Sequence, residues 1–444
     1  MRFRAAPALP SGTLSPMSSR AAFRLPILTL AVSEQRYSCH GCGNCCRDFT
    51  VQLRPDDLRR LGEQGWEAKL GQPVTVEFRG VTYLRQTDEG ACIFLQENGL
   101  CRIHAEFGYE NKPIACQLFP FTIVPGAKDA AMGVNFACAS VAASKGATLA
   151  SHRSELLRMA ERVPETIEAP VPTLLADGLV ASEREVECVT RGLDAWLRRS
   201  DVPLALRLDG LAWFAQSMVA AKLAGVREER FEELVSTLLG ALPDELAHLP
   251  IDPPSGRQGK LLRQAVFART EDPKIPALAR EGRWRTTLRQ LLLSRRFAKG
   301  KGVVPKVGSD WPASATFASV GAVLPLAASE EGGAIDDLLT RWLRSTILGR
   351  RAWGAGAYGW PIGLGLAALA LNAACVAWLA QLRAAGRGAG AVSLDDVRAG
   401  LGRVDRMAGR ARWLGSPAES MRVQWLAMDD GLRRLLRVHF VGTV

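Results

Sequence analysis

Residues 39–46 read CHGCGNCC, so four thiols fall within eight positions and two glycines separate them. A buried cysteine packs as a small hydrophobe, and no core helix or strand needs four of them in one short run. The glycines permit positive φ, so the backbone can bend and bring successive sulfurs together. Because thiolates are soft ligands, this run indicates a metal centre and constrains the fold more than any other feature.

Four further thiols follow, so eight of the ten cysteines lie between positions 39 and 138. In a long chain without a signal-peptide pattern, such crowding indicates metal or redox chemistry rather than a disulfide framework. The other two, Cys188 and Cys375, stand alone in helical-looking segments and are interpreted as core residues. The candidate metal ligands are Cys39, Cys42, Cys45, Cys46, Cys92, Cys101, Cys116 and Cys138.

The spacing C-x2-C-x2-C resembles the three-thiolate run of bacterial ferredoxins, whose remaining ligand comes from elsewhere in the chain. Zinc ribbons more often use two separated C-x2-C pairs, and the second pair is missing here. The pattern therefore favours a [4Fe-4S] cluster, with Zn²⁺ as the alternative. In an extended backbone the side chains of Cys45 and Cys46 would point in opposite directions, so we do not expect both to serve one metal ion. Eight thiols could supply two four-ligand sites, or one site with four cysteines to spare.

Short strands, turns and prolines around the cysteines predict a small domain held together by its ligands. Residues 55–61 indicate the start of a helix, since proline and two aspartates suit a first turn. Residues 74–78 and 81–84 flank an Arg-Gly pair and predict a hairpin. Residues 49–53 and 92–95 indicate two further short strands.

The sequence changes character near residue 150, and beyond a proline-rich linker at 164–172 its apolar residues recur with helical periodicity. We expect an α+β fold class. Residues 1–24 are interpreted as a disordered leader, 25–150 as a cysteine-cluster metal-binding domain and 151–444 as a mostly α-helical domain. Helices are expected within 151–163, 201–225, 231–246, 284–297 and 335–347, and a loop or irregular crossover within 302–330.

Residues 361–382 carry no charged side chain and are long enough to cross a membrane. The segment is rich in alanine and glycine and contains Asn372, as does a central helix that is apolar on all sides. We predict a buried core helix, and a membrane anchor through 361–382 is the weaker alternative because no orientation signal accompanies it. The pattern Ser393-x-x-Asp396 predicts a capping box for the following helix.

The net charge of +11 comes from arginines scattered along the expected helices. No basic stripe with interleaved aromatic residues accompanies it, which argues against nucleic acid as a partner. Cysteine usage and a short, proline-broken apolar run near the N-terminus predict a cytoplasmic protein. Since no Ser/His/Asp arrangement, phosphate loop or carboxylate pair stands out, the sequence leaves open whether the protein is an enzyme and which protein partners or substrates it has.

The cysteine motifs, taken with their flanking residues, resemble the YkgJ-type cysteine-cluster family over about residues 37–140. That family is described as zinc- or iron-chelating, so the resemblance implies that these cysteines bind a metal. The motifs that carry it are residues 39–47 (CHGCGNCCR), 51–53 (VQL), 92–95 (CIFL), 98–104 (NGLCRIH) and 112–120 (KPIACQLFP).

Flagellin lysine N-methylases are similar in this cysteine domain and also carry a long helical C-terminal half. The order from residues 336–339 through Arg350-Arg351 to the apolar segment 361–382 is loosely similar to theirs. At residues 138–140 this chain reads CAS, where the methylase pattern tends to end in a Cys-Pro-Glu-like element. The resemblance implies an alternative function, methyl transfer from S-adenosylmethionine to protein lysines, beside the metal-binding function that the cysteines predict.

Overall fold

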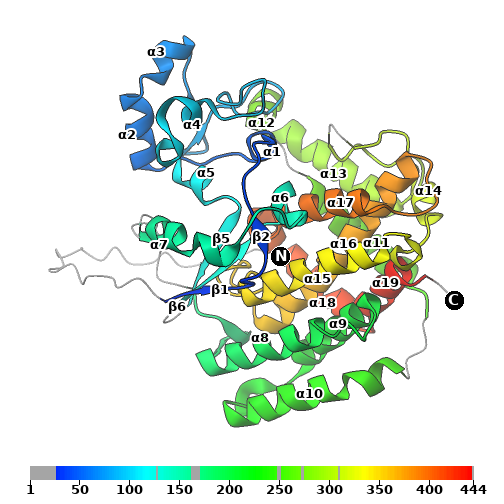
Figure 1. Ribbon diagram of the computed structural model, residues 1–444. Coiled ribbons are helices and arrows are strands. Elements are labelled where there is room, and N and C mark those ends of the chain that lie inside the picture. The colour runs from blue at the N-terminus through cyan, green and yellow to red at the C-terminus, as the bar shows by residue number, and fades with distance from the viewer. Residues whose placement is uncertain are drawn as a thin grey trace, which may run out of the picture.

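The computed structural model describes residues 27–126, 129–161, 171–247, 252–271, 275–308 and 311–442. The expected leader at 1–24 and nearly all of the proline-rich linker lie outside these residues. Figure 1 shows a smaller, blue to cyan lobe set against a larger helical body. We call residues 39–118 the cysteine lobe. The expected α+β class is confirmed, with short strands near the N-terminus and helices dominating the remainder.

The N-terminal third consists of short elements joined by turns. Its strands are β1 (Ile27–Leu30), β2 (Arg36–Tyr37), β3 (Thr75–Phe78), β4 (Val81–Leu84), β5 (Phe121–Pro125), β6 (Asp129–Val134) and β7 (Ala147–Thr148). Its helices are α1 (Asn44–Asp48), α2 (Pro55–Glu63), α3 (Trp66–Leu70), α4 (Arg102–Phe107), α5 (Ile114–Leu118), α6 (Ala139–Ala142) and α7 (Arg153–Glu161).

Local sequence chemistry explains the elements of the cysteine lobe that the sequence predicts. Helix α2 begins at Pro55, and the Asp57 carboxylate accepts the backbone N–H of Arg54 at 3.1 Å. Strands β3 and β4 form the expected hairpin, and its two turn residues, Arg79 and Gly80, both have positive φ. Such a turn matches the twist of the two strands that it joins.

The prediction of strands at 49–53 and 92–95 is wrong. These segments form only isolated bridges, which pair Gln52 with Tyr83, Gln86 with Cys92 and Leu95 with Cys101. The chain turns too often around the cysteines to offer a neighbouring strand of matching length, so alternation of apolar and polar residues does not produce a ladder here.

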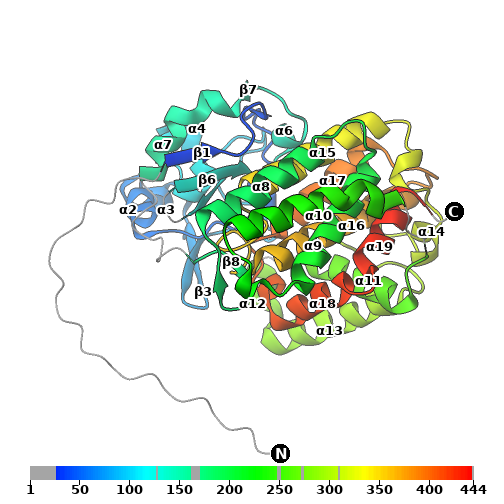
Figure 2. The same cartoon turned by 90° about the horizontal axis from the view of Figure 1, so that it is seen from below.

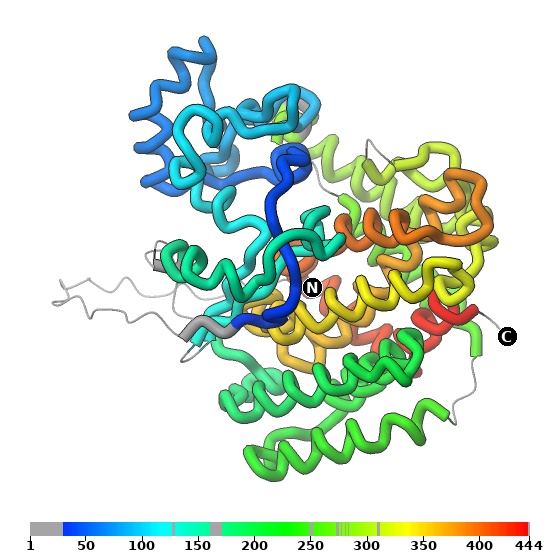
Figure 3. The backbone as a smooth tube through the Cα atoms, viewed as in Figure 1, coloured from blue at the N-terminus to red at the C-terminus, as the bar shows by residue number. Residues whose placement is uncertain are grey.

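A three-stranded sheet joins the lobe to the body. Its order is β1-β6-β5, with β1 parallel and β5 antiparallel to β6. Figure 3 shows the chain leaving this region at β2, running through the cysteine lobe and returning through α5 to β5. Met132 and Val134 of β6 are fully buried and belong to the same core as the helices of the body.

The described residues contain a small core in the cysteine lobe and a large core in the body. Trp66, Phe94 and Ile103 are buried in the small core, and Cys46, Cys101 and Cys116 pack against it. The large core already includes Phe121 and continues through the C-terminal helices. The domain boundary that the sequence places at residue 150 stays a prediction.

The helical body contains one small hairpin and twelve α-helices among the described residues. The hairpin is β8 (Leu174–Ala176) with β9 (Leu179–Val180), and Figure 2 shows α8, α9, α10 and α15 lying side by side. The helices are α8 (Glu183–Leu197), α9 (Leu204–Ala220), α10 (Glu229–Ala247), α11 (Gly256–Thr270), α12 (Ile275–Glu281), α13 (Arg283–Lys299), α14 (Phe317–Gly321), α15 (Gly332–Leu348), α16 (Ile362–Gly386), α17 (Leu394–Met407), α18 (Pro417–Ala427) and α19 (Gly431–Phe440).

Helix α16 is the centre of the body and packs against α9, α11, α17, α18 and α19. It is long and apolar enough to cross a membrane, and 94% of its most apolar window is buried inside the protein. That burial is the arrangement expected of a core helix. Its small residues allow close packing, because a Cβ on Gly363 would lie 3.0 Å from Met218. The Ser393 cap of the next helix, α17, is confirmed, with the capping box to Asp396 complete.

Asp405 on α17 ties the sheet to the helical body. Its carboxylate accepts hydrogen bonds from the Phe136 backbone N–H at 2.6 Å and from the Trp342 indole at 3.0 Å, and it pairs with Arg351 at 2.9 Å. Asp405 is 1% exposed. Three separate segments therefore depend on one buried charge.

Replacing Asp405 with asparagine removes that charge and leaves the Arg351 guanidinium buried without its counter-ion. We expect the free energy of unfolding to fall by about 3–5 kcal/mol, as for other broken buried pairs. The measurement is urea unfolding followed by circular dichroism. Asp201→Asn, which breaks the exposed pair with Arg199, is the matched control and should leave the stability nearly unchanged, because water and salt screen an exposed pair. Equal losses in the two variants would contradict the role given to Asp405.

His439 on α19 should make the folded protein less stable in acid. Its Nδ1 lies 2.7 Å from the Gln381 side-chain oxygen, and burial lowers its pKa from 6.5 to about 4. Between these two values the unfolded chain binds a proton that the folded protein does not, so the free energy of unfolding falls as pH decreases through this window. By pH 4.5 the loss should reach about 2–3 kcal/mol.

The measurement is urea unfolding at pH 7.0, 5.5 and 4.5 for the wild type and for His439→Gln. The variant has no titrating ring, so its stability should decrease less steeply over this range. Identical pH dependence in the two proteins would show that His439 does not contribute.

Candidate metal centre

Five of the eight candidate cysteines line one cavity of about 260 Å³. Cys45 and Cys46 come from α1, and Cys92 lies in the turn region after β4. Cys101 is the N-cap residue of α4, and Cys116 lies in α5. Four places in the chain thus bring thiols to the same space, and residues 46 and 92 are far apart in the sequence.

The side chains of Cys45 and Cys46 do not point in opposite directions, as they would in an extended backbone. Both thiols line the cavity, because the backbone is helical here rather than extended. In a helix successive side chains are about 100° apart instead of opposite. Gly43, with φ of 70°, is the N-cap of α1 and sets the direction in which the helix starts.

Close backbone contact fixes the CHGCGNCC run against the turn that precedes Cys101. A Cβ on Gly43 would lie 2.9 Å from the Gly99 carbonyl oxygen, and a Cβ on Gly99 would lie 2.9 Å from that of Gly41. The Cys92 backbone N–H donates to the Cys46 carbonyl at 2.8 Å. Glycine is therefore required on both sides of this contact, and the contact holds α1 beside the segments that carry Cys92 and Cys101.

Helix α5, which carries Cys116, is positioned by two buried polar side chains. The Ile114 N–H donates to the Asp57 carboxylate at 3.1 Å, and Asp57 is 1% exposed. Gln117, 2% exposed, donates to the Glu110 carbonyl at 3.0 Å. Because Cys116 lies between Ile114 and Gln117, these bonds fix its place on the cavity wall.

The remaining cavity wall is mostly apolar and includes two cations that the sequence did not predict as site residues, although Lys112 begins the motif at 112–120. Lys112 lies beside Cys116, and Arg410 reaches the cavity from the helical body. The Arg410 guanidinium stacks over the Phe49 ring with 4.5 Å between the group and the ring centroid. No local sequence signal identifies Arg410, since it is about 300 positions away from most of the cysteines.

The thiols differ in how readily they ionise. A hydrogen bond from the Cys46 thiol, helped by the charge of Lys112, lowers the pKa of Cys45 to about 6. The same bond raises the pKa of Cys46, and burial raises that of Cys92 to about 12 and also raises that of Cys116. Burial alone would lower the pKa of Lys112. The negative charges of the surrounding cysteines outweigh the effect of burial, so the pKa of Lys112 is raised.

This pattern means that metal binding must release protons. Cys45 is the thiol whose pKa is lowered, and it is the natural first ligand, since the thiolate is the ligand form. The raised pKa values of Cys46, Cys92 and Cys116 mean that these thiols release protons when a metal binds, so metal affinity should rise with pH.

The other three candidate cysteines lie outside this cavity. Cys39 and Cys42 are exposed, and Cys138 is the partly buried N-cap residue of α6. Burial raises the pKa of Cys138 to about 11, and the charges of Cys42 and Cys45 add to the effect. All ten cysteines are free thiols. His104 is exposed and packs against Tyr109, so it is not one of the cavity residues.

The cavity residues fit a soft metal group by their chemistry. They offer five sulfur donors, apolar walls and two cations. Among the residues that the structure describes, no three or more His, Cys, Asp or Glu side chains are arranged to hold an ion directly. The thiols therefore surround a space rather than converge on one point.

The comparisons with known proteins concern this part of the chain. Residues 38–139 match the family model CxxCxxCC, described as a "Putative zinc- or iron-chelating domain". A protein of Methanocaldococcus jannaschii, "Uncharacterized protein MJ0939", is 36% identical over 86 residues, which is 19% of this chain and 29% of the relative. The match thus spans less than a third of that relative.

No solved structure matches the chain. The match to the family model confirms the resemblance to the cysteine-cluster family and supports metal binding, whereas the weaker resemblance to flagellin lysine N-methylases is not confirmed. What the comparisons show is therefore a match of residues 38–139, the part of the chain that holds the cysteine cavity, to a domain described as zinc- or iron-chelating.

Proposed function

We propose that this protein is cytoplasmic and binds a [4Fe-4S] cluster in the cavity that Cys45, Cys46, Cys92, Cys101 and Cys116 line. The observation that carries the proposal is the meeting of five thiols around one space of about 260 Å³. A zinc site needs its ligands about 2.3 Å from one point. A cluster is itself several atoms across, so thiols spread around a cavity suit it better.

The proposed ligands are Cys45, Cys92, Cys101 and Cys116. Cys46 is the fifth thiol, and its interaction with the neighbouring Cys45 sulfur lowers the pKa of Cys45. Hydrogen bonds to ligand sulfurs are a known means of adjusting an iron–sulfur group. In this arrangement Cys46 orients and supports a ligand rather than serving as one.

Lys112 and Arg410 give the cavity positive charge at its edge. Four thiolates in a mostly apolar space repel one another, and nearby cations offset that repulsion. The aromatic rings of Phe49 and Phe119, whose centroids lie 4.6 Å apart, keep water from one side of the cavity. When bound, an iron–sulfur cluster supplies one-electron redox chemistry, and charge and solvent exposure set its potential.

The first test is the metal content of the protein after anaerobic purification. We expect iron and acid-labile sulfide in equal amounts, and loss of both in Cys92→Ser and Cys116→Ser. Cys188→Ser, at a partly buried cysteine far from the cavity in sequence, is the control and should retain both. Zinc without sulfide in the wild type would overturn the cluster and support a zinc centre instead.

The second test separates the two adjacent cysteines. Cys45→Ser should lose most of the iron, because it removes the thiol with the lowered pKa, while Cys46→Ser should retain iron and shift the reduction potential. Iron content and potentiometric titration give the two readouts. Loss of iron from Cys46→Ser with retention in Cys45→Ser would show that the ligand and supporting roles are reversed.

The methyltransferase alternative, with S-adenosylmethionine as the methyl donor, depends on the weaker resemblance alone. Saturable binding of S-adenosylmethionine to the purified protein would support it.

A further inference from the structure

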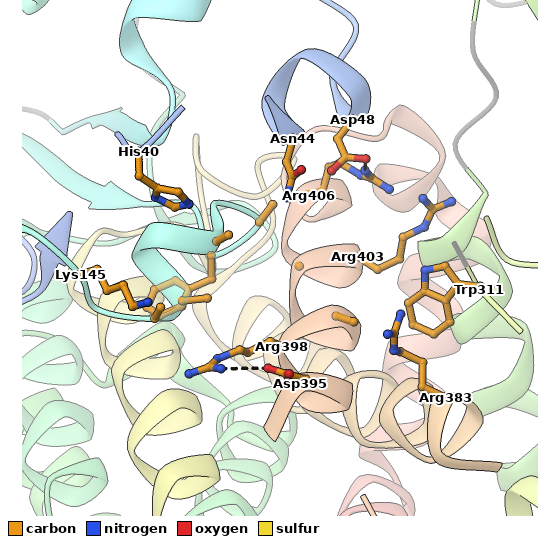
Figure 4. Close-up of a pocket in the computed structure, with 17 residues that line it drawn as sticks. His40, Asn44, Asp48, Lys145, Trp311, Arg383, Asp395, Arg398, Arg403 and Arg406 are labelled. Carbon is orange, nitrogen blue, oxygen red and sulfur yellow. Dashed lines mark hydrogen bonds and ion pairs between the residues drawn. The ribbon is translucent and has the colours of Figure 1, made fainter. Parts of the chain in front are cut away.

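A second cavity, of about 500 Å³, lies between the cysteine lobe and the helical body. Figure 4 shows side chains from several segments around it, with His40, Asn44 and Asp48 on the lobe side and the arginines of α17 on the body side. None of the eight candidate metal ligands lines this space. It is therefore a separate site from the thiol cavity.

Positive charge dominates the lining of this second cavity, which we call the basic cleft. The only acidic side chains that line it among the described residues are Asp48 and Asp395, so cations exceed carboxylates by three. Arg383 also pairs at 3.6 Å with the buried carboxylate of Asp396, which lies outside the lining. The cations are Lys145, Arg383, Arg398, Arg403 and Arg406.

Helix α17 places its arginines at the cleft through spacing. Arg398, Gly402 and Arg406 recur every four residues and lie on one face of the helix. Ala399 and Gly402 also line the cleft, and their small size leaves room between the arginines. The face is therefore basic and hollow rather than filled by packed side chains.

The far wall of the cleft is rigid and aromatic. The Arg383 guanidinium lies over the Trp311 ring, 5.5 Å from its centroid, and Trp311 is 5% exposed. The buried Nε of Arg398 has no hydrogen-bond acceptor among the described residues, although the same guanidinium pairs with Asp395 at 2.9 Å. The Nε of Arg383 lies 3.6 Å from the buried Asp396 carboxylate, so this ion pair and the Trp311 ring hold Arg383 in place.

We infer that the basic cleft binds a small organic polyanion that carries two or more phosphate or carboxylate groups. The planar fork of arginine matches both groups, and several arginines facing one space favour more than one anionic group. The volume lies within the range of small-molecule sites. A polar, cationic lining excludes apolar ligands and disfavours cationic ones.

A bound polyanion would link the segment after α6 to α17. Lys145 follows α6 on one side of the cleft, and Arg398 of α17 lies on the other. Asp48 of α1 already pairs with Arg406 of α17 at 2.5 Å, so the anion would add its link beside an existing one.

The test is isothermal titration calorimetry on the purified, metal-loaded full-length protein. Inorganic triphosphate and citrate serve as the phosphate and carboxylate probes, and tighter binding of one identifies the preferred group. The cleft variant is Lys145→Gln combined with Arg398→Gln. Lys260→Gln combined with Arg295→Gln is the matched control, since it removes the same charge at exposed positions outside the cleft.

We expect saturable binding at one site, at least tenfold weaker in the cleft variant and within twofold of wild type in the control. If the double variant does not fold, Lys145→Gln alone, at an exposed position, should weaken binding at least threefold. Absence of saturable binding for both probes, or equal weakening in the cleft and control variants, would overturn the inference. Neither result depends on which metal the thiol cavity holds.

Discussion

The contact between two glycine-containing turns is the constraint on which the cysteine lobe depends. Gly43 and Gly99 each lie where a Cβ would come within 2.9 Å of a carbonyl oxygen of the opposite turn. Only this approach brings α1, with Cys45 and Cys46, beside the stretch that carries Cys101. The small core around Trp66 supplies limited apolar burial, and small domains of this kind usually need ligands or cross-links as well. Backbone proximity and metal binding therefore support each other.

The lobe does not complete its own site. Arg410, which follows α17, closes the thiol cavity, and the Asp48–Arg406 pair joins α1 to the same helix. The sheet carries the chain from the lobe into the large core, and Asp405 fastens that segment to α17. A chain ending after the family domain would retain the five thiols but would lose Arg410. The helical body thus contributes to the metal centre through its charge as well as through support.

Local signals in the sequence predicted the local features. Pro55 and Asp57 predicted the start of α2, Arg79-Gly80 the hairpin, Ser393 a helix cap and the uncharged segment 361–382 a core helix. Each depends on residues a few positions apart. The expected opposition of Cys45 and Cys46 was wrong because it assumed an extended backbone, and Gly43 starts a helix instead. Lys112 and Arg410 were missed, since their place follows from how the lobe folds back and packs on the body. The sequence predicted eight candidate ligands, but only the fold separates five cavity thiols from Cys39, Cys42 and Cys138.

The short helix α1 separates the two cavities. Cys45 and Cys46 line the thiol cavity, while Asn44 and Asp48, four residues apart and therefore on one face, line the basic cleft. A helix with its side chains is about 10–12 Å across, and no residue of α1 is buried, so salt screens charges on its two sides and their coupling should be strongest at low ionic strength. Negative charge gained by the thiol cavity then weakens binding of an anion in the cleft. By reciprocity, a bound anion makes that gain of negative charge less favourable by the same free energy. If the cleft binds a polyanion, its affinity and the charge state of the metal centre are coupled through a helix of five residues.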